Sequence, residues 1–233
     1  MIAAVSAVGL AAAGAFAHGT YHRNSPIFGS ALGSLPLPRP GTRLAALTFD
    51  DGPNPEATPR ILDALAASGT VATFFLLGRH VERWPALAAR VAAEGHVVGN
   101  HGWRHRKLHT QSPGSVRTDL ELGTAAIIGA TGVRPEVFRA PHGFRAPWVS
   151  RIARSLGQRT VGWSLGVWDS ARPGVDAIVA RTVDGTRPGS ILLLHDGDGY
   201  DAAGDRTQTA AAVPRIIAAL GERGYTFVGV PAA

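Results

Sequence analysis

The sequence has 233 residues, a formal net charge of +6 and no cysteine. This length is enough for one domain with a sizeable core, and the lack of cysteine excludes disulfides and thiolate ligands, so His, Asp or Glu must hold any metal. Lys107 is the only lysine, and the arginines are spread along the chain without interleaved aromatic residues. This pattern argues against nucleic acid as a partner and favours anionic surfaces such as wall polymers or lipid headgroups.

The N-terminal segment, residues 1–17, is apolar from Ile2 onward and ends in Ala15-Phe16-Ala17, the small-x-small pattern of a signal-peptide cleavage site. No Lys or Arg precedes the apolar run, so an uncleaved membrane anchor is an alternative. A buried amphipathic helix is disfavoured because the run has no polar face of period 3.6. We therefore expect a secreted or membrane-anchored, extracytoplasmic protein.

The next segment, residues 18–43, is rich in Gly, Ser and Pro and has no periodicity, which predicts a linker. From there to the end, residues 44–233, the pattern predicts one folded domain. Apolar runs predict seven strands, at 44–49, 70–77, 96–99, 136–140, 159–163, 190–195 and 226–230.

Segments with helical periodicity separate these strands, and four of them close with Gly soon after the last apolar residue, as helix C-caps do. Alternation of strand and helix predicts βαβ units and a parallel sheet. A distorted or incomplete (β/α)7 barrel is the leading architecture, and an open doubly wound sheet is the second.

Polar side chains follow several of the predicted strands. Asp50 and Asp51 end the first strand, His101 follows the third, Arg139 lies at the fourth and His195 ends the sixth. The carboxyl ends of parallel strands meet at one edge of the fold, where sites are built. We therefore expect one polar site from these residues.

In "GNHGWRHRKLH", His101 and His105 are four residues apart. If the chain is helical there, both imidazoles project from one face and can hold one cation. Gly102 stands where a zincin has its glutamate, so the third ligand and the base must come from elsewhere. One of Asp50 and Asp51 can complete the ligand set while the other acts as general base toward water that the ion activates. The spacing of the residues leaves open which of the two carboxylates is the metal ligand and which is the general base.

The remaining candidates fit a hydrolytic site. Arg139 is expected to orient a carboxylate by a bidentate pair, and the turn at 141–143 to offer a backbone N–H to an oxyanion. His195 is a candidate general acid, with Asp169 as its orienter.

Two tryptophans of "GWSLGVWDS", Trp163 and Trp168, are candidate walls of a sugar-binding groove, or else core residues. The same stretch formally matches a G-x-S-x-G nucleophile elbow at Ser164, which makes a serine esterase a rival hypothesis. An elbow serine must be followed at once by a helix, and the Gly and Pro residues after Ser164 oppose one. Two His and one carboxylate also suit non-haem iron oxygenases, but their double-sheet barrel lacks the alternating helices expected here.

The motifs "TFDDGP", "HGWRH", "RAPHG", "WD" and "LLLHD", in this order over residues 44–230, resemble the polysaccharide deacetylase family, the NodB-like carbohydrate esterases. The resemblance implies a distorted (β/α)7 barrel that uses a divalent metal, usually Zn²⁺, with Co²⁺ or another divalent ion as alternatives. It implies hydrolysis of a non-peptide C–N bond, the N-acetyl group of N-acetylglucosamine-containing glycans such as peptidoglycan or chitin oligomers. The expected partner is such an N-acetylated glycan, the expected location is a bacterial cell envelope, and the expected state is a monomer.

Carried over position by position, the resemblance makes Asp50 the catalytic base, positioned by Arg139. It assigns the metal ligands as Asp51, His101 and His105. It makes His195 the general acid, supported by Asp169, and it gives the turn at His142 and Gly143 the oxyanion contact.

The sequence departs from the family pattern at Gly102, where Ser or Thr is common, at His142, where Tyr is frequent, and at Ser170, which stands in place of Trp. The last departure bears on the acetyl pocket unless Trp168 substitutes. A non-catalytic glycan-binding member of the same fold remains the alternative function, opposed by the presence of every expected catalytic residue type.

Overall fold

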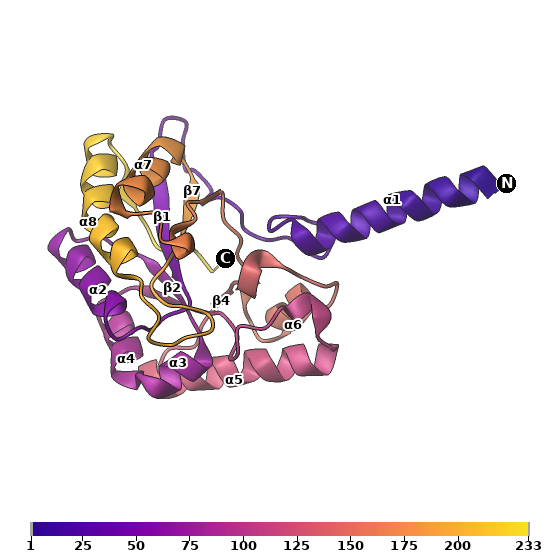
Figure 1. The fold of residues 1–233 in the computed structure, drawn as a ribbon, viewed down its shortest axis with the longest axis horizontal. Helices are drawn as coiled ribbons and strands as arrows, with labels where there is room; N and C mark the ends of the chain where they lie inside the picture. Colours follow the sequence, from indigo (N-terminus) through magenta and orange to yellow (C-terminus); the bar gives the residue numbers. More distant parts are fainter. Residues whose placement is uncertain (1, 233) are drawn as a thin grey trace.

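The computed structural model describes residues 2–232, with side chains from residue 9 onward. Within this range the body is a curled parallel sheet with helices packed around it (Figure 1). Its eight strands over residues 2–232 are β1 (Leu44–Asp50), β2 (Thr73–Leu76), β3 (Val97–Asn100), β4 (Val137–Phe138), β5 (Arg159–Thr160), β6 (Leu165–Gly166), β7 (Ser190–His195) and β8 (Thr226–Phe227).

The strand order is β5-β4-β3-β2-β1-β7-β6, and β8 pairs with the start of β1. Strand β1 is central and buried from Ala45 onward, as a continuous apolar run in a parallel sheet requires. Its register with β7 pairs Asp50 with His195, so two candidate site residues share one level of the sheet. The predicted distorted barrel is confirmed, with one strand, β6, that the sequence pattern did not predict.

The body helices are α2 (Ala57–Ala67), α3 (Gly78–Arg83), α4 (Pro85–Ala93), α5 (Pro113–Thr131), α6 (Val149–Ser155), α7 (Val175–Gly185) and α8 (Thr207–Glu222), with 3-10 turns η1 (Leu108–Thr110), η2 (Pro141–Gly143) and η3 (Asp169–Ala171). Helix α3 was not predicted, and α8 continues through Pro214. The main core lies between the sheet and helices such as α2 and α8, through side chains including Leu47, Ile61 and Ile216.

Helix α1 (Ile2–Tyr21) projects away from the body as an isolated rod (Figure 1). Residues 9–18 are exposed, whereas Gly19 and Thr20 are buried at the junction with the body. For the described side chains this excludes the buried-helix interpretation. Across residues 2–232, no helix combines the length and the apolar character needed to cross a membrane.

Residues 22–36, which we call the N-terminal strap, pack on the body instead of forming a free linker. Leu32 forms a parallel bridge with Val161, just beyond β5, and Ser34 forms an antiparallel bridge with Ser190 at the start of β7. Leu35 is buried. The prediction of a linker accounts for the lack of helices and strands here, but it is wrong about the packing of the strap.

Candidate active site

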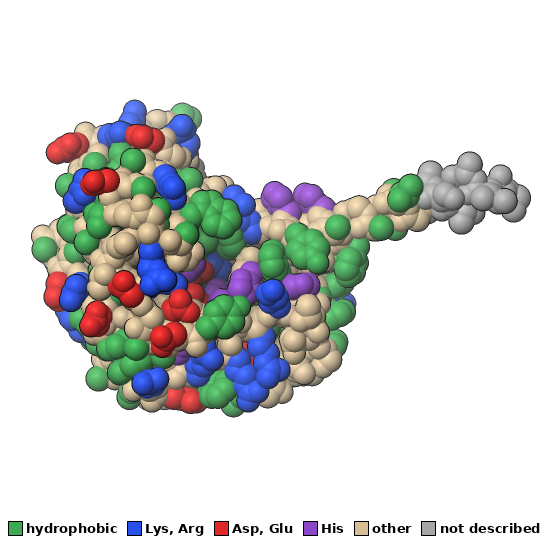
Figure 2. Space-filling view, in the orientation of Figure 1, with side chains coloured by type: hydrophobic (Ala, Val, Ile, Leu, Met, Phe, Trp, Pro, Cys, Tyr) green, Lys and Arg blue, Asp and Glu red, His purple; other side chains and the backbone are tan. Residues whose placement is uncertain are grey.

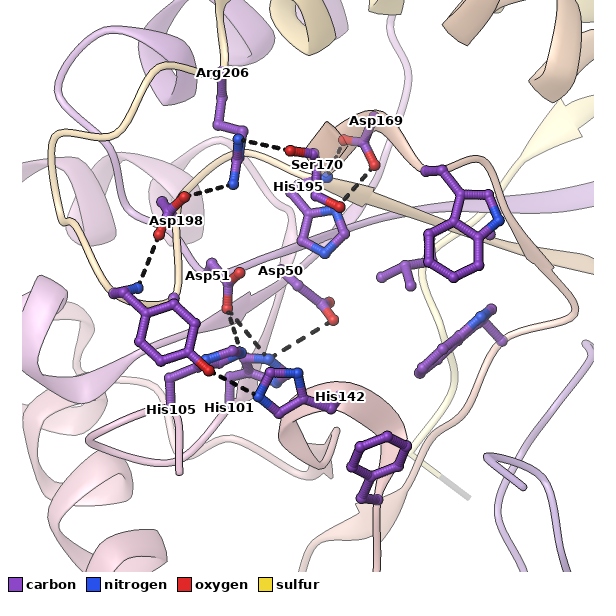
Figure 3. Close-up of a pocket in the computed structure, with 17 residues that line it drawn as sticks. Asp50, Asp51, His101, His105, His142, Asp169, Ser170, His195, Asp198 and Arg206 are labelled. Carbon is purple, nitrogen blue, oxygen red and sulfur yellow. Dashed lines mark hydrogen bonds and ion pairs between the residues drawn. The ribbon is translucent and has the colours of Figure 1, made fainter. Parts of the chain in front are cut away.

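A pocket of about 460 Å³ opens at the carboxyl ends of the strands. This volume suits a ligand the size of a sugar. In Figure 2 histidine side chains gather at a hollow on this face of the molecule, and Figure 3 shows the residues that converge there. They include Asp50, Asp51, His101, His105, His142, Trp163, Trp168, Asp169 and His195. The expectation of one shared site therefore holds for these residues.

The first group in the pocket is Asp51 with His101 and His105, all buried. The Oδ1 atom of Asp51 lies 3.4 Å from Nε2 of His101 and 3.2 Å from Nε2 of His105. No helix brings the two imidazoles together, contrary to the sequence prediction. The chain leaves β3 in a loop, with Gly102 at φ 81° and His105 at φ 55°, and this loop turns both rings toward Asp51.

The donor atoms of this group fit a divalent cation. Nδ1 of His101 lies 2.8 Å from the carbonyl oxygen of Arg139 and donates to it, which leaves Nε2 of the ring facing Asp51. Asp51 Oδ1 is buried without a hydrogen-bond donor among the described residues. Burial raises the pKa of Asp51, but the neighbouring imidazoles of His105 and His101 outweigh it and hold that pKa well below the usual range. One donor atom from each residue lies within 4.8 Å of the others, so the group can take a cation.

The second group is Asp50 with Arg139. Nη1 of Arg139 donates to Asp50 Oδ1 at 2.7 Å and to Thr48 Oγ1 at 2.8 Å, while Nη2 donates to the carbonyl of Gly162 at 2.8 Å. The contact with Asp50 uses one N–H group, so the predicted bidentate pair is wrong. The other carboxylate oxygen, Oδ2, lies 3.8 Å from Nε2 of His101. Asp50 is therefore held by one oxygen and presents the other beside the metal group.

The third group is His195 with Asp169. Asp169 Oδ1 lies 2.9 Å from Nδ1 of His195, and Oδ2 accepts hydrogen bonds from the His195 backbone N–H and from Thr209 Oγ1, both at 2.8 Å. Burial lowers the pKa of His195, but the charge of Asp169 and its hydrogen bond outweigh this and raise the pKa to about 9. The imidazole thus carries a proton at neutral pH, with Nε2 free to donate it.

The turn η2 forms another wall of the pocket, with His142 at φ 61°. Its backbone N–H makes none of the hydrogen bonds found among residues 2–232 and remains available as a donor. Gly143 packs against the ring of Trp163 so closely that a Cβ atom there would collide with it. The side chain of His142 lies 3.2 Å from the hydroxyl of Tyr200 (Figure 3).

The two tryptophans differ. Trp168 is 75% exposed at the pocket mouth, and its backbone is left-handed, with φ 59°. Trp163 is half-buried, with the guanidinium groups of Arg23 and Arg139 5.3 and 5.7 Å from its ring. Both line the pocket, so the groove-wall hypothesis fits their places, and Trp168 offers the freer ring face.

The loop between β7 and α8 supplies pocket residues that the sequence analysis missed. Tyr200 is 69% exposed and packs edge-on to the ring of His105. Asp198 Oδ1 accepts the backbone N–H of Tyr200, and Asp198 Oδ2 pairs with Arg206 at 2.7 Å. Gly199 covers His105 so closely that a Cβ atom would strike the imidazole. The signal was the Gly- and Asp-rich run "DGDGYDAAGDR" directly after a predicted strand.

The rival hypotheses find no support in the geometry. Ser164 is followed by β6 rather than a helix, and its Oγ atom lies 2.9 Å from the Ile191 backbone nitrogen that donates to it. Ser164 is therefore a structural contact to β7, and the expectation that no helix follows it is confirmed, which leaves the serine esterase hypothesis without support. The parallel sheet with intervening helices likewise excludes the double-sheet barrel of the iron oxygenases.

Comparison with known proteins places the chain in a family. The profile of the polysaccharide deacetylase family matches residues 38–161. A chitooligosaccharide deacetylase of Rhizobium leguminosarum bv. trifolii is 42% identical over 192 residues, covering 79% of this chain and 89% of that protein. A peptidoglycan-N-acetylglucosamine deacetylase of Bacillus cereus is 38% identical over 193 residues, covering 81% of this chain and 86% of the relative.

Among solved structures, the crystal structure of a peptidoglycan N-acetylglucosamine deacetylase superimposes with a TM-score of 0.80 at 32% identity, covering 87% of this chain and 91% of that one. The fold, the three groups of the pocket and these relatives agree. The chain belongs to the polysaccharide deacetylase family. It is accordingly a hydrolase of the carbohydrate esterase type with a NodB-like domain, and the resemblance inferred from its motifs is confirmed.

Proposed function

We propose that the protein removes N-acetyl groups from N-acetylglucosamine residues of a cell-wall or related glycan. The observation that carries the proposal is the meeting of three groups in one pocket: Asp51 with two histidines, Asp50 with Arg139, and His195 with Asp169. Such a pocket offers a cation site, a base and an acid within reach of one amide bond. Relatives named as chitooligosaccharide and peptidoglycan deacetylases support this chemistry.

In the proposed reaction Asp50 acts as general base through Oδ2 while Arg139 holds Oδ1. Asp50 takes a proton from water as the water oxygen bonds to the amide carbon, and the C–N bond breaks afterwards. The free N–H of His142 stabilises the negative charge that develops on the amide oxygen. His195, kept protonated by Asp169, gives its proton to the departing amine, which completes hydrolysis to acetate and a free amino sugar.

The ligands proposed for the cation are Asp51, His101 and His105. Two imidazoles with one carboxylate are a donor set that zinc prefers, so Zn²⁺ is the proposed metal, with Co²⁺ as a functional substitute. A divalent cation bound there would polarise the amide carbonyl and acidify water. This chain's contribution is to orient the ligands, through the Arg139 carbonyl on His101 and the Gly199 backbone against His105.

Several other properties belong to the same proposal. Trp168 and Tyr200 are the exposed aromatic residues of the body that line the pocket, and their rings suit stacking on sugars on either side of the reacting one. Residues 1–17 are proposed to direct export or to anchor the protein outside the cytoplasm. The catalytic domain, residues 44–233, is proposed to act as a monomer on N-acetylated glycan.

Acetate release from N-acetylglucosamine oligomers, peptidoglycan and small acetamides, with and without a chelator, tests the proposal. Activity is expected on at least one glycan, lost with chelator and restored by Zn²⁺ or Co²⁺. A serine-directed phosphonate is expected to leave activity unchanged. No acetate from any of these substrates, with glycan still retained by the protein, would instead establish the non-catalytic binding alternative.

A further inference from the structure

We propose that the N-terminal strap completes the active site and that Arg23 is a positioning residue for the glycan-binding wall at Trp163. This inference rests on the proposed deacetylase function. The strap lies before residue 38, where the family profile begins to match, so the shared motifs assign it no role. Figure 1 shows it running from the base of α1 across the body to the loop before β1.

A buried cation anchors the strap. Arg145 is 1% exposed, and its guanidinium donates to the carbonyls of Ser25 at 2.6 Å and Gly29 at 2.9 Å. Its backbone N–H donates to the carbonyl of Thr20 at 3.1 Å. No carboxylate pairs with Arg145 within residues 2–232. Because a buried charge without hydrogen bonds is costly, the strap carbonyls are required partners of this guanidinium, and the strap is fixed on the body.

The strap also forms backbone hydrogen bonds with the chain that leaves β5. The N–H of Leu32 donates to Thr160 at 3.0 Å, and the Leu32 carbonyl accepts the N–H of Gly162 at 2.9 Å. The carbonyl of the same Gly162 accepts Nη2 of Arg139, whose Nη1 holds Asp50. Gly162 thus links the strap to Arg139 through two hydrogen bonds, one at its N–H and one at its carbonyl, and Arg139 positions the proposed base.

Arg23 makes the most direct contact between the strap and the pocket. Its Nε donates to the carbonyl of Trp163 at 2.8 Å, and its guanidinium lies 5.3 Å from the centre of the tryptophan ring. Asn24 adds a second hydrogen bond to the same carbonyl at 3.0 Å. Trp163 lines the pocket, and its neighbours β5 and β6 are only two residues long each, so the sheet alone gives this residue little support.

These contacts assign the orientation of Trp163 to Arg23. Trp163 lines the pocket as a candidate wall of the sugar-binding groove and is none of the proposed acid, base or ligand residues, so losing Arg23 should weaken binding of a glycan while sparing the chemical step. Arginine is the suited residue, since its planar fork donates along Nε while its face stacks on the ring. Lysine keeps the charge but has neither property.

The test compares Arg23→Ala and Arg23→Lys with Arg39→Ala, an exposed arginine just beyond the strap, all in the full-length chain loaded with Zn²⁺. Arg23→Ala is expected to raise KM for an N-acetylglucosamine oligomer about five-fold or more, with kcat nearly unchanged. Arg23→Lys should resemble Arg23→Ala, and Arg39→Ala should match the wild type. A small acetyl ester, which does not occupy the groove, should be hydrolysed equally by all four proteins.

Unchanged KM in both Arg23 variants would overturn the inference. An equal loss of activity on the oligomer and the small ester, with a lower melting temperature, would also overturn it, because that pattern marks general destabilisation. If Arg23→Ala does not fold, Asn24→Ala, which removes the neighbouring hydrogen bond, must show the same rise in KM. If the wild type and Arg39→Ala release no acetate either, the proposed function fails. That outcome differs from a failure of the inference about Arg23, in which both of these proteins are active.

Discussion

Two histidines in the pocket, His105 and His195, each lie beside a buried carboxylate. The pKa of His105 is nevertheless lowered, whereas the pKa of His195 is raised. Asp51 is shared between His105 and His101, at 3.2 and 3.4 Å. Burial, together with the charge of His101, lowers the pKa of His105 to about 3 despite Asp51. Asp169 serves His195 alone, and the pKa of His195 rises to about 9. His101 shares Asp51 as well, but it also faces Asp50, and its pKa is raised despite burial. The number of carboxylates near each imidazole therefore separates the neutral ligand His105 from the protonated acid His195.

The largest expected effect comes from removing the neutral member of this comparison. His105→Ala deletes one of the three proposed metal ligands. Losing a residue that only orients a ligand lowers metal affinity roughly 10- to 100-fold, so losing the ligand itself should lower the affinity further. Turnover should be lost almost completely. Metal content of the purified variant and acetate release measure both effects. His109→Ala, four residues further on and outside the cluster, should keep its metal. Full metal loading in His105→Ala would contradict the ligand assignment.

A smaller effect is expected at Asp50, the proposed general base. Asp50→Asn keeps the shape and the hydrogen bond from Arg139 but removes the basic oxygen, so turnover should fall by about 10²- to 10⁴-fold. Metal content should stay at the wild-type level, since Asp51 and both imidazoles are untouched. Near-normal rates in this variant would show that another group is the base.

The smallest expected effect is a change in the pH dependence of activity, which we expect to follow the protonation of His195. His195 must carry a proton to act as acid, so activity falls as pH rises through its pKa, which Asp169 holds high. Asp169→Asn removes the charge that raises the pKa and leaves the burial that lowers it, so the alkaline limb should move to lower pH. The profile of kcat/KM against pH measures the shift. A bound cation lowers the limb in both proteins, so the difference between them is the result.

Exposed Asp176→Asn is the matched control for that profile and should leave the alkaline limb where it is in the wild type. An alkaline limb that stays in place in Asp169→Asn would remove Asp169 from the proposed support of His195. A limb that moves upward would contradict the sign of the argument.

Much of the fold and site is predictable from the sequence because strand ends and motif residues coincide. The apolar run before Asp50 and the run before His195 are long and continuous, so both strands and the level of their carboxyl ends follow from pattern alone. The pairing of His101 with His105 was also expected, but for the wrong local reason, since a loop with positive φ brings the rings together instead of a helix turn.

Other features depend on contacts between distant segments, which periodicity does not record. Strand β6 is two residues long and exists through its pairing with β7. Tyr200 is placed by Asp198 and Arg206, in a loop without any repeating pattern. The composition of the strap indicates only that it forms no regular structure. Its packing requires Arg145, which lies more than a hundred residues away along the chain.

The backbone is left-handed at four residues of the pocket, and this conformation lowers stability while it places their side chains or N–H groups in the site. The four are Asp51, His105, His142 and Trp168. Each is a non-glycine residue where glycine is more comfortable, at a cost of roughly 1–3 kcal/mol apiece, and each lines the pocket. Selection of random variants for heat resistance alone would therefore favour glycine at these four positions. Glycine at Asp51 or His105 would also delete a proposed metal ligand, and glycine at Trp168 would delete a proposed sugar contact. Glycine at His142 would keep the backbone N–H proposed for the oxyanion, so a more stable and still active variant is to be sought there or elsewhere in the chain.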